Sequence, residues 1–200
     1  MPLPDRHAER LRLLADVIAH DGSAFVDRVQ RALRLATDLL GYDIGLLSHI
    51  AGTSYTIVGA YAPGTEIAPG TVFDLGNTYC SLTLARGDLL EIVRATGSDA
   101  DGHPCHREFG LESYLGVPIR VDGEVWGTLN FSSAEPLKVP LETADHDLAR
   151  LFAVWIGGVL EREDRDRQIA QEASRLSNIV DQAPLIVYGV DAAGRFTMSE

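Results

Sequence analysis

The first forty residues carry apolar side chains at helical spacing. A helix is predicted over residues 7–20, and Ser23 is a candidate N-cap for a second helix, because its hydroxyl can accept a hydrogen bond from the first turn. The second helix is expected to end at Gly41. Its apolar face consists of Phe25, Val29, Ala32, Leu33, Ala36 and Leu40. A helix with one apolar face needs a surface to pack on, and strands follow directly.

The pattern after Gly41 is typical of strands. β-Branched and aromatic residues are concentrated in four stretches, residues 42–50, 54–61, 71–75 and 89–93. A short helix is predicted at residues 77–85 and another at 103–111. Residues 95–104 are rich in Gly, Asp and Ser, which indicates a loop.

The clearest hairpin joins residues 114–121 to residues 124–131. Asp122 and Gly123 lie between these two apolar segments. A two-residue type I′ turn requires positive φ at both central positions, and Asp-Gly is a pair that tolerates it. The sequence therefore predicts a tight hairpin here.

From Thr143 the spacing becomes helical again. Positions four and three residues apart are Leu148, Phe152, Trp155, Val159, Arg162, Asp166, Ile169, Ala173 and Leu176. One interpretation is a surface helix that packs on its own domain as far as Leu160 and continues as a charged, solvated tail. The other is the seam of a parallel dimer, which is favoured because the seam resumes after the two charged positions.

Residues 181–200 contain a strand, a Gly turn and a second strand. An isolated hairpin is marginal in water, so we expect the protein to continue past Glu200. The order of elements predicts the α+β class: an antiparallel sheet of five or six strands with helices on one face, followed by a long C-terminal helix.

Three segments resemble the GAF family: residues 76–81, residues 103–111, and residues 114–119 with the following strand 125–129. The likeness covers roughly residues 24 to 160. It implies a five- or six-stranded antiparallel sheet that encloses a small-molecule pocket beneath loops and short helices.

Residues from Leu176 onward resemble the beginning of a PAS domain. The predicted division is an N-terminal helix (1–22), a GAF domain (23–160), a coiled-coil-like signalling linker (161–175) and the incomplete start of a PAS domain (176–200). The resemblance implies a bacterial sensor protein with a histidine kinase or diguanylate cyclase as output, and the chain contains neither output domain.

Composition limits the partners. Hydrophobic residues make up 46% of the 200 positions, and the formal net charge is −12. Without a basic stripe, counterion release cannot drive binding to a polyanion, so neither nucleic acid nor an anionic membrane is expected as a partner. No apolar run is long enough to span a bilayer and the N-terminus lacks a signal-peptide layout, which predicts a cytoplasmic protein.

The two cysteines are the candidates for reactive chemistry. Cys105 stands next to His106, with His103 and Arg107 nearby, and this setting can lower a thiol pKa. Similarity to cyanobacteriochromes would make Cys105 a bilin attachment site, although it lies about one helical turn closer to Val117 than that pattern expects.

Similarity to free methionine-R-sulfoxide reductases would pair Cys105 with Cys80, but that family uses a further cysteine. A metal or haem site is weaker still, because no fourth ligand is apparent. The cofactor is left unassigned between bilin, haem and none, and the favoured interpretation is that both cysteines are packing residues.

A ligand pocket needs apolar walls and a few converging polar groups. The start of the predicted lid helix supplies Asn77, Thr78 and Tyr79, whose backbone N–H groups could hold an anion, although Asn77 and Thr78 could equally serve as caps. The remaining candidate ligand-binding residues are Cys80, Cys105, His106, Tyr114, Thr128 and Asn130.

The sequence holds no Gly-x-Ser-x-Gly, Walker or paired-carboxylate motif, so no catalytic residue is assigned and no enzymatic activity is expected. The function predicted is a sensory module in which a small molecule shifts the lid and biases the pairing of the C-terminal helix in a homodimer. Arg162 and Asp166 weaken the predicted seam where such a switch would be easiest.

Overall fold

The computed structural model describes residue 15, residues 24–182, residues 188–190 and residues 196–198 of the chain. The helix predicted over residues 7–20 therefore lies almost wholly outside the described residues. The chain forms two compact units, one up to Glu161 and one from Arg162 onward, and each is described by itself.

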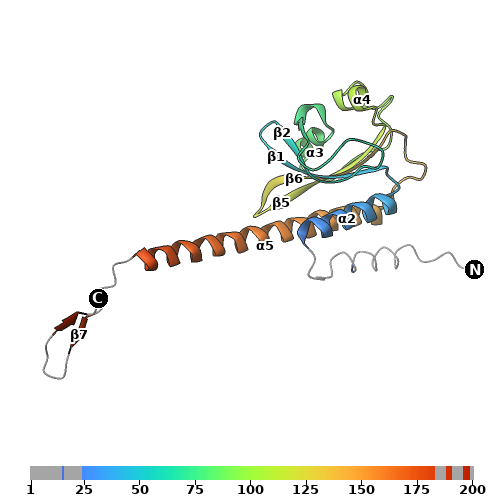
Figure 1. The fold of residues 1–200 in the computed structure, drawn as a ribbon. Helices are drawn as coiled ribbons and strands as arrows, with labels where there is room; N and C mark the ends of the chain where they lie inside the picture. The colour runs from blue at the N-terminus through green and yellow to red at the C-terminus, as the bar shows by residue number, and fades with distance from the viewer. Residues whose placement is uncertain (1–14, 16–23, 183–187, 191–195, 199–200) are drawn as a thin grey trace, which may run out of the picture. The chain divides into compact units, whose positions relative to one another are not determined.

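The first unit is built on a six-stranded antiparallel sheet with the order β3-β2-β1-β6-β5-β4 (Figure 1). The strands are β1 (Ile44–Ala51), β2 (Ser54–Tyr61), β3 (Val72–Asp74), β4 (Leu90–Ile92), β5 (Ser113–Val121) and β6 (Glu124–Ser133). The predicted α+β class with its six-stranded antiparallel sheet is confirmed. In the central pair, β1 lies beside β6 with Ser48 opposite Thr128. The two halves of the sheet are therefore joined by strands that are far apart in the sequence.

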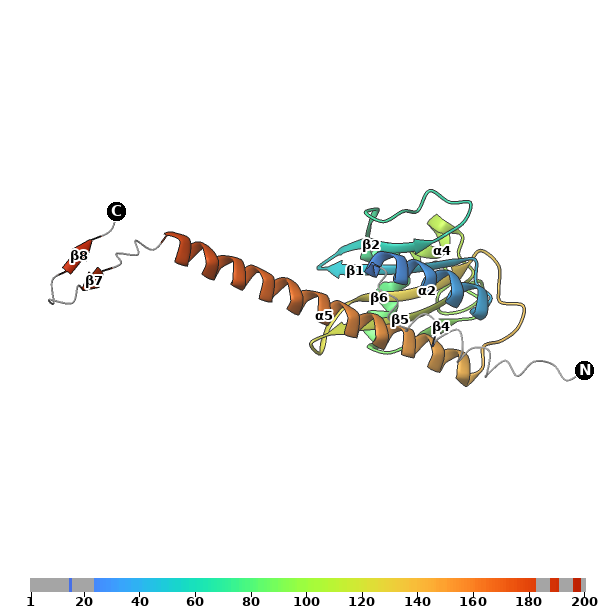
Figure 2. The same cartoon turned by 60° about the horizontal axis from the view of Figure 1, so that its bottom comes forward.

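The two faces of the sheet bury different clusters, because successive side chains of a strand point to opposite sides. Leu47 belongs to the cluster beneath α2 (Phe25–Leu40) and α5 (Thr143–Gln182), whereas Leu46 belongs to the cluster on the other face. Figure 2 shows the two long helices in front of the sheet. The short helices α3 (Cys80–Arg86) and α4 (Pro104–Phe109) cover the opposite face (Figure 1).

Predictions for one turn and for the two ends of α2 can be compared directly with the structure. Asp122 and Gly123 have φ values of 49° and 83°, so the type I′ turn is confirmed. The N-cap of α2 is Ala24, which makes no side-chain capping bond, and Ser23, the predicted cap, lies outside the described residues. The helix ends at Gly41 in the left-handed conformation, as predicted.

The first half of α5 packs against its own domain. Leu148 and Phe152 are buried in the cluster shared with α2 and the sheet, and Val159 is buried as well. At Gly157 the helix approaches β5 so closely that a Cβ atom would clash with the carbonyl oxygen of Arg120. The predicted dimer seam is therefore wrong for this half of the helix, because its seam positions Leu148, Phe152 and Val159 are already covered within the chain.

In the second unit, the part of α5 from Arg162 to residue 178 has almost entirely exposed side chains. Pairs one turn apart support it, with Arg167 Nη2 3.3 Å from Glu163 Oε2 and Gln168 Nε2 2.8 Å from Asp164 Oδ2. Strands β7 (Tyr188–Val190) and β8 (Phe196–Met198) pair antiparallel, as the sequence predicts. No helix among the described residues is both long enough and apolar enough to cross a membrane.

Candidate functional site

A cavity of about 200 Å³ lies on the sheet face covered by α3 and α4. The sheet forms its floor, and the short helices with the loop after β2 form its cover. Its lining residues are Ile44, Leu46, Tyr55, Thr65, Ile67, Phe73, Thr78, Tyr79, Cys80, Cys105, Phe109, Leu111, Tyr114, Asn130 and Ser132. The edge-on contact of Phe73 with Phe109, with ring centroids 5.6 Å apart, joins the short strand β3 to α4.

Six of the nine residues predicted for the ligand site line this cavity: Thr78, Tyr79, Cys80, Cys105, Tyr114 and Asn130. The structure places the other three elsewhere. Asn77 ends the 3₁₀ turn η1 (Leu75–Asn77), and Thr128 is fully buried beside Cys80, away from the lining. His106 takes part in a polar network on the outer side of α4, so the prediction that these three line the pocket is wrong.

The start of the lid differs from the predicted helix 77–85. The 3₁₀ turn η1 comes first, and α3 begins only at Cys80, with Tyr79 as an N-cap that makes no side-chain bond. The N–H of Thr78 donates to Leu75 O at 3.0 Å, and the N–H of Ser81 donates to Thr78 O at 3.2 Å. The N–H of Thr78, one of the three expected to hold an anion, is thus used within the protein, and neither Asn77 nor Thr78 caps α3.

Neutral hydroxyl groups surround the Cys80 thiol. Thr128 Oγ1 lies 3.2 Å and Tyr114 Oη 3.4 Å from Cys80 Sγ, and both donate to it. Tyr114 Oη also lies 2.6 Å from Thr83 Oγ1, and Thr128 Oγ1 lies 2.8 Å from Ser48 Oγ. Burial raises the pKa of the Cys80 thiol, and the surrounding hydroxyl donors offset only part of this effect.

The Cys105 thiol is also buried, at the start of α4. Desolvation raises its pKa to about 12, and a hydrogen bond from the Tyr79 backbone N–H offsets part of the increase. The ring of the neighbouring His106 contacts the carboxylates of Asp101 and Glu112 and makes no hydrogen bond to the thiol among the described residues. The expectation that this setting lowers the thiol pKa is therefore wrong.

Both thiols are expected to resist alkylation in the folded protein, because the thiolate is the reactive form and burial disfavours it. Treated with iodoacetamide at pH 7.5, Cys80 and Cys105 should stay unmodified over the time in which free glutathione is fully labelled. Intact-mass measurement checks this, and both thiols should react once the chain is unfolded in urea. Rapid modification of Cys105 in the folded protein would contradict the burial argument and revive the thiol-enzyme interpretation.

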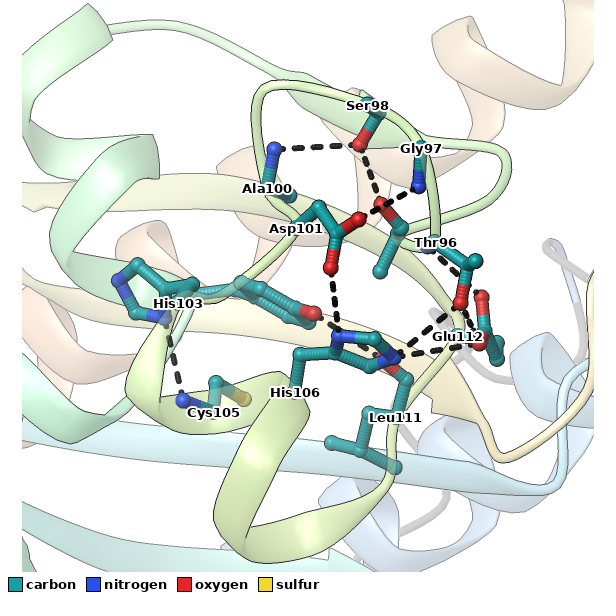
Figure 3. A network of polar contacts seen from close by, with 12 residues as sticks. Thr96, Gly97, Ser98, Ala100, Asp101, His103, Cys105, His106, Leu111 and Glu112 are labelled. Carbon is teal, nitrogen blue, oxygen red and sulfur yellow. Dashed lines mark hydrogen bonds and ion pairs between the residues drawn. The ribbon is translucent and has the colours of Figure 1, made fainter.

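His106 anchors α4 to the preceding loop and to the residue before β5 (Figure 3). Its Nε2 lies 3.1 Å from Glu112 Oε1, and its Nδ1 lies 3.7 Å from Asp101 Oδ1. Glu112 also accepts hydrogen bonds from the hydroxyl and the N–H of Thr96, and these, more than His106, lower its pKa to about 2. The network holds the cover in place from outside the cavity, so His106 has a structural role here.

His103 caps α4 rather than facing the cavity. Its Nδ1 accepts a hydrogen bond from the Cys105 N–H at 3.1 Å, and its ring lies 5.1 Å from that of Tyr79. Burial, with a smaller contribution from Arg107, lowers the pKa of the imidazole, which favours its neutral form. No cluster of three potential metal-ligating side chains occurs in the described part of the chain.

Sequence reasoning missed several wall residues, of which Ser132 and Phe109 are the most informative. Ser132 stands two positions after Asn130 on β6 and therefore shares its face, so strand alternation alone could have identified it. Phe109 ends α4, where an exposed aromatic residue gives no local signal of a pocket below it.

The cavity does not fit the cofactors considered from the sequence. A cavity of about 150 Å³ holds benzene, and a bilin or haem has four pyrrole rings and two carboxylates. The 200 Å³ cavity is too small for four pyrrole rings. No Arg or Lys among the described residues lines it to pair with the carboxylates. An axial histidine is also missing from its lining, since His103 and His106 are both held elsewhere.

Comparison with known families gives one match, to the family described as GAF domain, over residues 25–160. Among curated proteins, none matches the chain. Solved structures share the fold at low identity. The chain is similar to the GAF domain of an Acinetobacter phosphoenolpyruvate-protein phosphotransferase, at 14% identity and a TM-score of 0.66, over 83% of this chain and 99% of that one.

Two further solved structures correspond to the alternatives drawn from the sequence. Free methionine-R-sulfoxide reductase from Neisseria meningitidis, solved with its substrate, aligns at 13% identity and a TM-score of 0.62, over 82% of this chain and 96% of that one. The phycocyanobilin-bound GAF domain of a cyanobacterial phytochrome aligns at 16% identity and a TM-score of 0.59, over 82% and 98%. At such identities the likeness extends to the fold alone.

Proposed function

The chain belongs to the GAF domain family, a ligand-binding sensory fold, and we propose that it is the input region of a cytoplasmic bacterial signalling protein. A small molecule binds in the cavity between the sheet and the short helices, and the change passes along α5. The proposal extends to a PAS domain beginning near residue 176 and to an output domain, a histidine kinase or a diguanylate cyclase, beyond the chain.

The observation that carries this proposal is a pair of contacts between α5 and the segment that follows α3, a helix of the cavity cover. Helix α3, which contributes Cys80 to the cavity, leads through Gly87 into the segment that ends in β4. Arg150 on α5 lies 3.5 Å from Asp88, and His146 on α5 lies 2.8 Å from Glu91 in β4. A displacement of α3 by a ligand would therefore act on α5 directly.

Such a link needs little energy. A coupling of about 1–3 kcal/mol between ligand and helix changes affinity or output by roughly one to two orders of magnitude. The Arg150–Asp88 pair is exposed and contributes little stability by itself, so it can break and form without threatening the fold. Weak, reversible contacts of this kind suit a transmitting element better than a buried core contact does.

The dimer is part of the same proposal, with a revised seam. Because Phe152 and Val159 are buried in the chain's own core, the exposed positions of the predicted seam are those beyond residue 161. Ile169 is 66% exposed and Leu176 is 59% exposed, one heptad apart on the helix. Two copies pairing through these residues would cover apolar surface that is otherwise in water.

An enzymatic alternative has less support. Thiol catalysis needs an accessible thiolate, and burial raises the pKa of both Cys80 and Cys105. A bilin photoreceptor would need a larger cavity and cationic partners for the chromophore. We therefore keep the non-catalytic sensor as the proposed function.

The coupling can be tested without knowing the ligand. Ser132→Phe places a benzene-sized ring in the cavity, which is large enough for one. We expect lower deuterium uptake in residues 75–86 and 104–109, and altered uptake in α5 beyond residue 161. Hydrogen–deuterium exchange followed by mass spectrometry measures both regions in one experiment.

The matched control is Ser132→Phe combined with His146→Ala and Arg150→Ala. With both contacts to β4 and the preceding loop removed, the cover should respond as before while α5 no longer does. If the filled cavity changes the cover but leaves α5 unchanged even with the contacts intact, the proposed route from cavity to helix is wrong.

A further inference from the structure

We propose that the ligand of this cavity is a small uncharged molecule, about one ring with one substituent, whose single hydrogen-bonding group meets Asn130 and Ser132. The inference rests on the proposed sensory function and adds the chemical class of the ligand. It follows from three properties of the site: the charge of its walls, the position of its polar groups and its size.

The walls carry no formal charge. Of the fifteen lining side chains, none is an Asp, Glu, Lys, Arg or His. The titratable groups that remain are two thiols and three phenols, and burial raises the pKa of every one of them, which keeps them neutral at neutral pH. A charged ligand would lose its hydration without finding a counter-charge, and this penalty is large in an apolar site.

The backbone does not replace the missing charge. In many sites a helix N-terminus binds an anion through free N–H groups. Here the N–H of Thr78 and the N–H of Ser81 donate to carbonyl oxygens, and the N–H of Tyr79 hydrogen-bonds to the Cys105 thiol. Helix α3 has only seven residues, so its macrodipole is also small.

Two polar side chains of the lining, Asn130 and Ser132, lie in one row on the floor. Asn130 and Ser132 are alternate residues of β6 and therefore point to the same side of the sheet. Asn130 Nδ2 donates to Tyr55 Oη at 2.9 Å, which fixes the carboxamide. Ser132 is 1% exposed, and within the described part of the chain its hydroxyl makes no hydrogen bond. A ligand group placed over this row would hydrogen-bond to the Ser132 hydroxyl, which lines the cavity.

The rest of the cavity selects for apolar surface. Ile67, Phe73, Phe109 and Leu111 are among the apolar residues that line the cavity. The volume of about 200 Å³ exceeds the 150 Å³ that holds benzene, so a substituted ring fits and a nucleotide does not. Together these features favour an aromatic or compact aliphatic molecule that carries one amide, hydroxyl or carbonyl group.

Three probes with the same ring separate charge from size: benzamide is neutral, benzoate is an anion and benzylamine is a cation at pH 7. Saturation-transfer NMR titrations with the whole 200-residue chain measure their dissociation constants. We expect benzamide to bind with about millimolar affinity, as suits a probe of this size, and at least about tenfold more tightly than either charged probe.

Variants locate the site. Ser132→Ala removes the unpaired hydroxyl with little disturbance and should weaken benzamide binding severalfold, and Asn130→Leu should weaken it further. Val154→Ala, on the exposed face of α5, should leave it unchanged. Because Asn130→Leu could also disturb the fold, circular dichroism checks that each variant is folded. If Asn130→Leu is unfolded, the conclusion rests on Ser132→Ala.

The inference is overturned if benzoate or benzylamine binds as tightly as benzamide, if benzamide binding is insensitive to Ser132→Ala, or if none of the probes binds. If a charged probe binds the parent chain as tightly as benzamide and Ser132→Phe abolishes that binding, the ligand class is refuted while the proposed sensory function stands. The exchange experiment on Ser132→Phe needs no ligand and therefore decides separately on the proposed function.

Discussion

Replacement of Phe152 by alanine is expected to lower the free energy of unfolding of the first unit by about 3–5 kcal/mol. Phe152 is 1% exposed on α5 and packs in the cluster that includes Leu33 of α2 and Phe131 of β6. Truncating a buried phenylalanine removes its transfer free energy and leaves a cavity. Against a total stability of about 5–15 kcal/mol for a domain, the loss would be a large fraction.

Urea denaturation at two protein concentrations measures this effect, with Val154→Ala as the control. Val154 lies two residues further along the same helix and is 71% exposed, so its truncation should change stability by less than about 0.5 kcal/mol. The loss for Phe152→Ala should be the same at both concentrations, because the contacts are within one chain. If Phe152→Ala lowered the free energy of unfolding only at the higher concentration, Phe152 would instead lie in a dimer interface.

A double variant tests the proposed dimer. Ile169→Asp combined with Leu176→Asp should leave unfolding of the first unit unchanged, since both side chains are largely exposed. In sedimentation velocity the double variant should be monomeric at concentrations where the parent chain dimerises. If the parent is monomeric throughout, the paired-helix part of the proposal is refuted and α5 acts as a single helix.

The elements predicted correctly are those governed by local rules. Asp122 and Gly123 determine a hairpin because few other residues tolerate positive φ at both turn positions, and that rule needs no knowledge of the rest of the fold. The apolar spacing of α5 is different. A stripe containing Phe152 fits a partner helix and a sheet of the same chain equally well, and only the closeness of Gly157 to β5 in three dimensions decides between them.

In the site, too, some residues follow from local sequence rules and others depend on tertiary packing. Cys80, Tyr114 and Asn130 were identified from their place on the predicted lid and strands, and they line the cavity. Thr128 shares the face of Asn130 but lies beneath the Cys80 thiol, which depends on how α3 sits on the sheet. His106 turns outward because Asp101 and Glu112 hold its ring, and no spacing rule predicts such a pairing between loop residues.

Because the cavity is lined by neutral groups, a charge placed in it by Asn130→Asp is expected to lower the stability of the protein strongly. Asn130→Asp keeps the shape of the side chain and introduces an ionisable group at a position that is 3% exposed. Tyr55 Oη can donate to a carboxylate, but no cationic side chain lines the cavity within the described residues. We expect the variant to lose about 3–5 kcal/mol of stability at pH 7, which is typical of an uncompensated buried charge.

The pH dependence identifies the cause. Burial raises the folded-state pKa of the new carboxyl group above its unfolded value of about 3.9, so over the range between the two values the folded state binds more protons than the unfolded state. Stability relative to the parent should therefore be lowest above the raised pKa and recover as the pH falls toward 4. Below the unfolded value the carboxyl is neutral in both states and most of the deficit should vanish.

Asn77→Asp provides the matched control, because Asn77 is partly exposed and lies outside the cavity. Its stability should follow that of the parent chain at every pH, within about 0.5 kcal/mol. Thermal unfolding between pH 4 and pH 8 compares the three proteins. If Asn130→Asp shows a constant deficit with no recovery at low pH, its cost comes from lost hydrogen bonds and not from charge. The cavity would then tolerate ions, and the argument for an uncharged ligand would lose its main physical support.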